Sequence, residues 1–242
     1  YLAVYAAERT GNPHAFDHGT RDGHLLEQII EKDLELRNRK VELSEAFPAY
    51  KRQKSYLLAG LLIDDVSNYA LLSGVHAVKK DGVYHRGMEG FCAEQNMVQV
   101  PLAVLSEWER MECDHNEIWI VENPSIFARL CGEHPCMCMN GQPRLAGLLV
   151  LDLLAEAGTV IHYAGDLDPE GLLIAQKLSQ YYKGAFYYWH MTEEDYHMCR
   201  SKEALSERRI GMLQKITDPQ LLPVARAIAE YGMAGYQEKI DY

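Results

Sequence analysis

The chain has 242 residues, of which 48% are hydrophobic and 24% are charged, values that are ordinary for a globular protein with a substantial core. No apolar run approaches the ~18–20 residues that a membrane span needs, so we expect no membrane partner. The formal net charge of −11 disfavours binding of nucleic acids through bulk electrostatics, because Lys and Arg are the side chains that attract phosphates. A nucleic-acid enzyme of this composition would need positive charge from a metal ion or a partner.

Six cysteines occur in a chain that opens without a charged and then apolar leader, so we expect reduced thiols and a cytoplasmic protein. The segment CGEHPCMC (131–138) contains three of them beside a histidine. No second cysteine pair stands out, and alternation with methionine is typical of a buried strand, so we do not expect zinc there. The sequence starts at Tyr1 within an expected helix, and we therefore expect an N-terminal region to be missing.

Residues 1–90 are expected to be mainly helical. Apolar residues recur at helical spacing in HLLEQIIEKDLELRNRKVEL (24–43), and YLLAGLLIDDVSNYALL (56–72) continues with a strongly apolar stretch. The polar segment 79–90 indicates a loop or hairpin. Within the apolar stretch, the acidic pair Asp64–Asp65 is expected at a helix end or a solvated turn.

From about residue 96 the pattern alternates between strands and helices. Strands are expected over 96–100, 117–122, 134–139, 159–165 and 185–190. Helices are expected over 101–111, 124–130, 144–157, 169–182 and after 192, and two more in a tail from 204 to 242. Strands joined by single helices imply right-handed crossovers. We therefore predict an α/β fold over 91–242, with a mostly parallel sheet flanked by helices and a helical tail.

Three carboxylates follow the expected strands. Glu122 ends the strand EIWIVE, and Asp166 and Asp168 follow the strand TVIHYAG. In parallel α/β sheets, ligand sites gather beyond the carboxyl ends of the strands. Residues i and i+2 of an extended chain point to one side, so the two aspartates can converge, and neighbouring strands lie only ~4.8 Å apart.

Such a cluster predicts a hard divalent cation. Carboxylates forced together stay ionised when a cation neutralises them, and magnesium (or manganese) takes a few carboxylates while also binding phosphate oxygens. Glu170 is a further candidate ligand, and Gly171 allows close approach of the backbone at a helix start that favours an anion. The alternative is an ordinary helix start at Asp168-Pro169-Glu170, which explains neither of the other two carboxylates.

The order of a strand ending in Glu, followed by a strand and DxDxxG, resembles the Toprim domain of topoisomerases, primases and related nucleases. Longer phrases are more specific: GNPHAFDHGT, LLIDDVSNYALL, IWIVENPSIF, CMNGQPRLAGLLVLDLLAEAG, HYAGDLDPEGLLIAQKL and MTEEDY. Together they resemble the nuclease subunit of Wadjet anti-plasmid defence systems (JetD), which is similar to the topoisomerase VI A subunit. The resemblance covers nearly the whole chain.

This resemblance implies a homodimeric endonuclease that cuts plasmid DNA when a partner SMC-type, DNA-extruding ATPase complex recruits it. Glu122, Asp166 and Asp168 fall on the Toprim metal-ligand positions. The rim of the site would contain Asn123, Gly141, Gln142 and Gly171, for which roles as helix starts and turns are equally open. Residues 1–90 would be the remnant of a DNA-binding or linker region, because we expect the family's N-terminal arm and much of its winged-helix region to be absent here.

Other functions stay open on the residues alone. The chain could be a Toprim module that binds metal or DNA without hydrolysis, or a phosphotransferase that holds a metal–diphosphate on residues 166–168. The last class needs a nucleoside pocket, and no glycine-rich phosphate loop is visible. No tyrosine occupies a recognisable nucleophile position, and Tyr50 and Tyr56 are expected in the core or an interface. We therefore favour hydrolysis by metal-bound water. Likewise, His162 is expected in the core. Glu238 could lie near the site, although we expect it on a solvated helix face.

Overall fold

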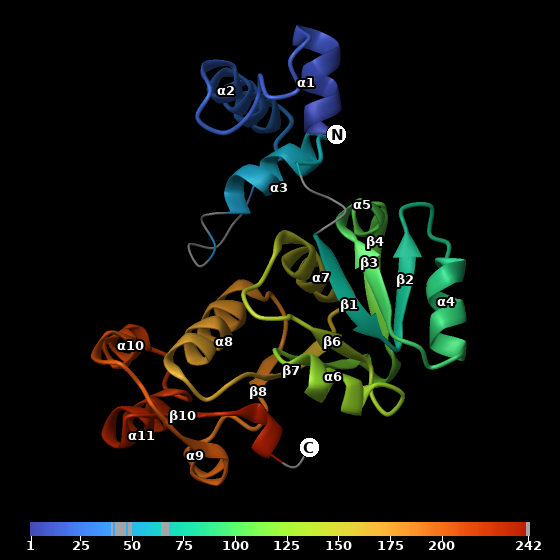
Figure 1. The fold of residues 1–242 in the computed structure, drawn as a ribbon. Helices are drawn as coiled ribbons and strands as arrows, with labels where there is room; N and C mark the ends of the chain where they lie inside the picture. The colour runs from blue at the N-terminus through green and yellow to red at the C-terminus, as the bar shows by residue number, and fades with distance from the viewer. Residues whose placement is uncertain (40, 42–46, 48–49, 64–67, 241–242) are drawn as a thin grey trace.

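The structure is a computed structural model that describes residues 1–39, 41, 47, 50–63 and 68–240. The acidic pair Asp64–Asp65 lies outside these residues. Figure 1 shows three N-terminal helices set apart from a larger α/β body, to which α3 is the nearest of the three. These helices are α1 (Leu2–Thr10), α2 (Arg21–Leu36) and α3 (Lys51–Leu58).

The N-terminal helices have a small core of their own, which contains Leu2, Ile30, Leu34 and Tyr56. Helix α3 also contacts the body. Lys54 donates from Nζ to Asp152 Oδ2 at 2.8 Å and to the Tyr181 hydroxyl at 3.1 Å. The helical character expected for this part of the chain is confirmed for α1, α2 and α3.

The body is built on one six-stranded sheet with the order β3-β1-β6-β5-β7-β8. Its strands are β1 (Tyr69–Ser73), β3 (Val98–Pro101), β5 (Glu117–Val121), β6 (Cys136–Cys138), β7 (Val160–Ala164) and β8 (Phe186–Tyr188). Strands β6, β5, β7 and β8 run parallel, and β1 is antiparallel to both of its neighbours. The predicted mostly parallel α/β sheet flanked by helices is therefore confirmed.

Two helices that follow neighbouring strands cover opposite faces of this sheet. Ile118 and Ile120 of β5 belong to the main core together with α7 (Leu145–Glu156). Val121, at an alternate position of the same strand, packs instead with α6 (Pro124–Leu130). The chain therefore passes from the end of β5 to one face of the sheet, and from the end of β6 to the other face. Helix α8 (Pro169–Tyr181) joins β7 to β8 and shares the main core.

Smaller elements surround the sheet. Before β5 lie β2 (Val75–Lys79), α4 (Arg86–Ala93), α5 (Leu102–Leu105), β4 (Trp108–Cys113) and η2 (Asp114–Asn116), with β2 and β4 paired. After β8 lie α9 (Glu193–Cys199), β9 (Arg200–Ala204), α10 (Glu207–Met212), η3 (Leu213–Lys215), α11 (Leu222–Tyr231), β10 (Met233–Gly235) and η4 (Gln237–Lys239). The two tail helices expected after residue 204 are confirmed as α10 and α11.

Three expectations about secondary structure are wrong. The apolar stretch 56–72 does not stay helical, because 69–73 form β1 in the central sheet; β2 also precedes residue 90. The division at residue 90 therefore separates β1 from its own sheet. The helix expected over 101–111 is only the single turn α5, after which β4 pairs with β2, and the loop expected over 79–90 includes the start of α4. A short apolar run suits a buried strand as well as a helix, and tertiary pairing decides between them.

The helix boundaries read from caps hold well. Asn123 caps α6, with Pro124 at its first position, and Thr192 and Asp195 form the expected capping box of α9.

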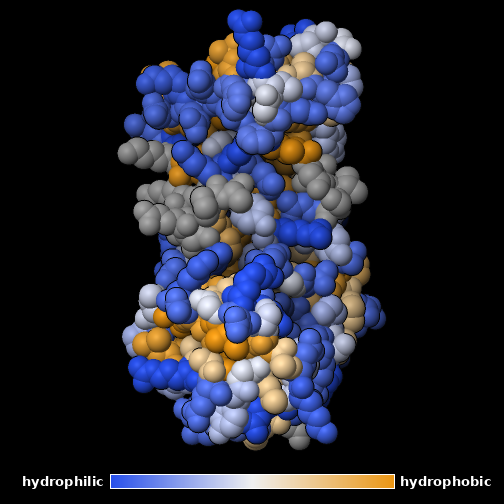
Figure 2. Space-filling model, turned by 60° about the vertical axis from the view of Figure 1, so that its left-hand side comes forward, coloured by the Kyte–Doolittle hydropathy of each residue, from blue (hydrophilic) through white to orange (hydrophobic). Residues whose placement is uncertain are grey.

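Among the described residues, no helix combines the length and apolar character needed to span a bilayer. Figure 2 shows mainly hydrophilic residues over the N-terminal helices on this face, and a gathering of apolar residues on the body below them.

Candidate functional site

Glu122 and Asp166 lie at the same edge of the sheet. Glu122 directly follows β5, and Asp166 follows β7 after Gly165. The two strands are neighbours, with Val121 paired to Ala164, and the Glu122 N–H donates to the Ala164 carbonyl at 3.2 Å. Parallel pairing therefore places both carboxylates beyond the carboxyl ends of adjacent strands, as the sequence predicts.

Glu122 is the most desolvated of these carboxylates. Its Oε2 atom is buried and accepts no hydrogen bond from the described residues. Burial, followed by the charges of Asp166 and Asp168, raises the pKa of Glu122 to about 7, while a hydrogen bond from the Asp166 backbone opposes this rise. A Cβ at Gly165 would lie 3.3 Å from Oε2, so a side chain there would crowd the carboxylate.

Asp166 is also held in an environment that disfavours its ionised form. Burial raises the pKa of Asp166 to about 6, with smaller contributions from the charges of Asp168 and Glu238. The backbone N–H of Gln237 donates to Asp166 Oδ1 at 3.1 Å and acts in the opposite direction. Two neighbouring carboxylates thus share one poorly solvated edge.

These raised pKa values have a defined effect on stability. Because the folded protein holds the Glu122 proton more tightly than the unfolded chain, the free energy of unfolding falls as pH rises from the ordinary value of 4.5 to about 7. The loss is complete above that range and absent below it. A cation beside the two carboxylates would favour their ionised forms and remove this penalty.

Asp168 has a different set of partners. It caps α8 by accepting from the Gly171 N–H at 2.7 Å, which is the ordinary helix-start role considered for it. Its other oxygen accepts from Arg209 Nη2 at 2.6 Å. The same guanidinium donates to Glu170 in three contacts of 2.7 to 3.0 Å. Arg209, from the short helix α10, therefore neutralises much of the charge at the start of α8.

This ion pair determines which of the predicted metal ligands are available to a cation. Glu170, expected as a further ligand, is bound to Arg209. Within the described part of the chain, no three His, Cys, Asp or Glu side chains are arranged to hold one metal ion. The residues that fit a hard cation as they stand are Glu122, with its unpartnered buried oxygen, and Asp166 beside it. Asp168 could join them only if Arg209 released it.

Gly171 is required by the backbone around Asp166. A Cβ at this position would lie 2.2 Å from the Asp166 carbonyl oxygen and 3.0 Å from its carbonyl carbon. Backbone atoms cannot yield as a flexible side chain can, so any larger residue would displace the loop that contains Asp166. The close approach predicted for Gly171 is what the structure shows.

The C-terminal segment covers the loop between β7 and α8. Leu167 and Gly235 exchange two backbone hydrogen bonds of 2.9 Å each. Beyond them, Glu238 accepts from Asn123 Nδ2 at 2.6 Å through Oε1. Glu238 therefore lies against the start of α6, and it is exposed within η4, as expected of a solvated helical position. Asn123 combines this contact with its role as helix cap.

Two residues of the site do not stand out in the sequence. Arg209 and Arg208 form one basic pair, and only the fold directs the first of them to α8. Gln237 contributes a backbone N–H, which no sequence pattern identifies. For Glu238, by contrast, a place near the site is one of the two positions that the sequence leaves open.

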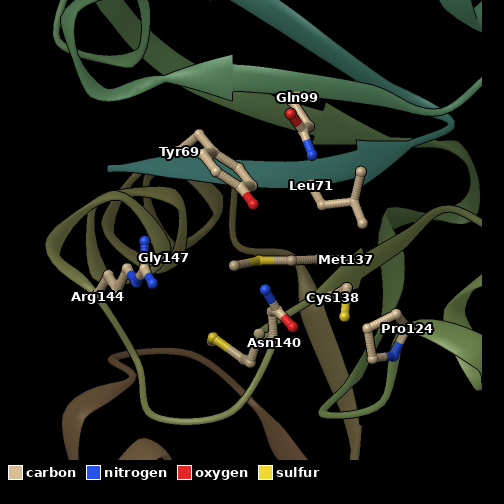
Figure 3. A pocket seen from close by; sticks show the side chains of 10 residues that line it. Tyr69, Leu71, Gln99, Pro124, Met137, Cys138, Asn140, Arg144 and Gly147 are labelled. Atoms are coloured by element: carbon tan, nitrogen blue, oxygen red, sulfur yellow. The ribbon is translucent and has the colours of Figure 1, made fainter. Parts of the chain in front are cut away.

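The predicted rim residues Gly141 and Gln142 lie in the turn after β6. Gly141 has a φ of 84°, which favours glycine, and Gln142 is exposed. Beside this turn is a pocket of about 180 Å³, shown in Figure 3. It is lined by Tyr69, Leu71, Gln99, Pro124, Met137, Cys138, Met139, Asn140, Arg144 and Gly147.

The remaining candidates have structural roles. Tyr56 is buried among the N-terminal helices, and the Tyr50 hydroxyl donates to the Pro143 carbonyl, so both lie where the sequence places them. His162 stacks between Trp119 and Tyr187, with ring centroids 4.9 and 5.8 Å away. All six cysteines are free thiols.

Comparison with known proteins places the chain in a family without assigning an activity. No curated protein matches it. A family model described as "Protein of unknown function N-terminus (DUF3323)" matches residues 1–77. A second model, described as "Protein of unknown function C-terminus (DUF2399)", matches residues 98–241, more than half of the chain and the whole of the carboxylate site. The chain therefore belongs to the DUF2399 family.

Proposed function

We propose that this protein is a metal-dependent endonuclease of the Toprim type, which cleaves plasmid DNA by phosphodiester hydrolysis within an anti-plasmid defence complex. One observation carries the proposal. Glu122 keeps a buried, unpartnered carboxylate oxygen beside Asp166, at the carboxyl edge of two adjacent parallel strands. An arrangement that raises the pKa of both groups is destabilising alone, and a divalent cation would offset it.

Each residue would have a distinct part in this site. Glu122 and Asp166 would hold magnesium or manganese, and Asp168 would complete the set after leaving Arg209. Such an ion, when bound, polarises a phosphodiester and lowers the pKa of water. Gly165 and Gly171 keep the space between the carboxylate loops free of side chains. Gln237, through its backbone N–H, orients Asp166.

The resemblance supports the wider setting of the proposal. It implies a homodimer that works in the cytoplasm under an SMC-type ATPase complex and receives DNA from it. The net charge of −11 is consistent with this dependence, because the chain has little bulk attraction for DNA. Free cysteines are typical of a reducing compartment.

A second candidate is a Toprim module that binds metal or DNA without hydrolysis. The observation that favours it is the pairing of Asp168 and Glu170 with Arg209, which leaves only Glu122 and Asp166 of the four proposed metal ligands without a cationic partner in the described structure. In this case the catalytic step would belong to another subunit.

Plasmid cleavage by the full chain with its partner complex, in magnesium or manganese, tests the proposal. We expect linear or nicked plasmid with the wild type and loss of cleavage in Glu122→Ala, Asp166→Ala and Asp168→Ala. Glu8→Ala, which removes an exposed carboxylate from α1, is the matched control and should cut normally. Cleavage that persists in each of the three site variants would refute the nuclease site. Metal binding without cleavage in the wild type would favour the second candidate.

A further inference from the structure

The pocket in Figure 3 lies at a topological switch point of the sheet. The chain leaves β5 for α6 on one face and β6 for α7 on the other, so the loops after these neighbouring strands diverge. In open α/β sheets, such divergence opens a crevice beyond the carboxyl ends of the strands, where ligands bind. Pro124 lines the pocket from the first loop, and Asn140 and Arg144 line it from the second.

The pocket is next to the carboxylate site. Cys138, which lines it, donates from Sγ to the Glu122 backbone carbonyl at 3.5 Å. Pro124 lies two residues after Glu122 in the chain. A molecule in the pocket would therefore be a neighbour of any substrate group held at Glu122.

The lining combines an apolar surface with several hydrogen-bonding groups. Met137 and Met139 provide thioethers, and Tyr69, Gln99 and Asn140 provide a hydroxyl and two amides. Figure 3 shows the Tyr69 hydroxyl and the Asn140 amide directed toward the Met137 side chain from opposite sides. The guanidinium of Arg144 lies at the edge of the same space.

This chemistry fits a nucleotide. The volume of about 180 Å³ is below the roughly 300–1,000 Å³ typical of pockets for drug-sized ligands, so it suits one flat ring system. Thioether sulfur makes favourable contacts with aromatic rings, and side-chain amides pair with the edges of bases. Arginine is suited to the adjoining phosphate.

We propose that this pocket holds the base of one unpaired nucleotide of the DNA strand cut at the neighbouring carboxylates, with Arg144 on its phosphate. The inference rests on the proposed nuclease function and adds a subsite to it. A base must leave its stack to enter, so mismatched or already single-stranded DNA is the preferred occupant. The pocket would thus favour cleavage where the duplex is opened.

Gly147 offers a way to reduce the pocket without touching its polar groups. This residue lies inside α7, where glycine is about 1 kcal/mol less favourable than alanine. A Cβ there would lie 3.2 Å from Met139 Sδ and 3.3 Å from Met137 Cε, both at the far ends of flexible side chains. Gly147→Ala should therefore move the thioethers and leave the helix intact.

Photocrosslinking of a short single-stranded DNA that contains 5-iododeoxyuridine, in EDTA so that no metal acts, tests the subsite. We expect adducts on Tyr69, Met137 or Met139 in the wild type, and a several-fold lower yield in Gly147→Ala. Gln99→Leu, at an exposed strand position, should also lower the yield. Gly90→Ala, a helical glycine with no atom within 4 Å of its Cβ, is the control and should not change it.

The outcomes separate this inference from the nuclease proposal. Adducts in the pocket from a protein that never cuts DNA would support the subsite and count against the nuclease. Adducts confined to other peptides, or no adduct at all, would overturn the subsite even if the protein cuts. Unlabelled strand should suppress the adduct at a far lower concentration than free thymidine monophosphate. Equal suppression by the two would overturn the assignment to a DNA strand.

Discussion

Arg209 should compete with a divalent cation for Asp168. The guanidinium of Arg209 contacts Asp168 at 2.6 Å and Glu170 at 2.7 to 3.0 Å. If a metal ion needs the Asp168 carboxylate, it must first displace this guanidinium. Arg209→Gln, which keeps a polar side chain but removes the charge, should therefore bind metal more tightly than the wild type.

The expected gain in metal affinity follows from the solvent exposure of the Arg209 and Asp168 side chains. Hydrogen bonds to charged partners contribute about 1.5–3 kcal/mol when well shielded. The Arg209 side chain is 25% exposed and that of Asp168 is 13% exposed, so water weakens the interaction. A net contribution of about 1–2 kcal/mol corresponds to a ~5–30-fold gain in metal affinity on substitution. The same change should lower the melting temperature without metal by about 2–4 °C per kcal/mol.

Electron paramagnetic resonance of free Mn²⁺ measures this affinity directly and needs no catalytic activity. Arg208→Gln is the matched control, because it removes the same charge from an exposed position on the same helix. We expect tighter Mn²⁺ binding only in Arg209→Gln, and a smaller stability difference from wild type when Mn²⁺ is saturating. Equal affinities for the two variants, or weaker binding in Arg209→Gln, would refute the competition.

Three further substitutions test other parts of the molecule. Gly171→Ala should destabilise the fold by about 1–3 kcal/mol and abolish Mn²⁺ binding, because its Cβ collides with the Asp166 backbone, whereas Gly90→Ala should be neutral or stabilising in chemical unfolding. Glu122→Gln should stabilise the metal-free protein by up to ~3 kcal/mol above pH 7, and this gain should vanish as pH falls to 4.5; a gain independent of pH would contradict the assigned pKa. Lys54→Met should increase protease cleavage between the N-terminal helices and the body, because Lys54 Nζ joins them; an unchanged digestion pattern would contradict this role.

The strands that carry the carboxylates could be predicted because local signals agreed with the fold. An apolar strand, an Asn-Pro or Asp-Pro helix start and an apolar helix follow one another twice, and caps fix the boundaries at Asn123 and Asp168. The strands β1, β2 and β4 could not be predicted in the same way. Each of them depends on a distant partner strand, and β1 joins the sheet only because β6 and β3 accept it on both sides.

The positions of the carboxylates could be predicted from the sequence. The position of the arginine that neutralises two of them could not. Position at the ends of adjacent parallel strands follows from local pattern and topology, which placed Glu122 beside Asp166. Arg209 lies 41 residues after Asp168, on a six-residue helix whose direction depends on the packing of the whole C-terminal segment. Nothing in the sequence distinguishes it from Arg208. The glycine at position 171 indicates a close contact, but the short distance from its Cβ position to the Asp166 backbone depends on the three-dimensional fold.

The division of charge at the sheet edge favours binding of a cation from outside the chain. Arg209 satisfies Asp168 and Glu170, and it leaves Glu122 and Asp166 with raised pKa values and no cationic partner in the described structure. Proton binding relieves the pair below about pH 6, whereas metal binding relieves it above that range. Near neutral pH the two processes oppose each other, so metal affinity should rise with pH as Glu122 ionises.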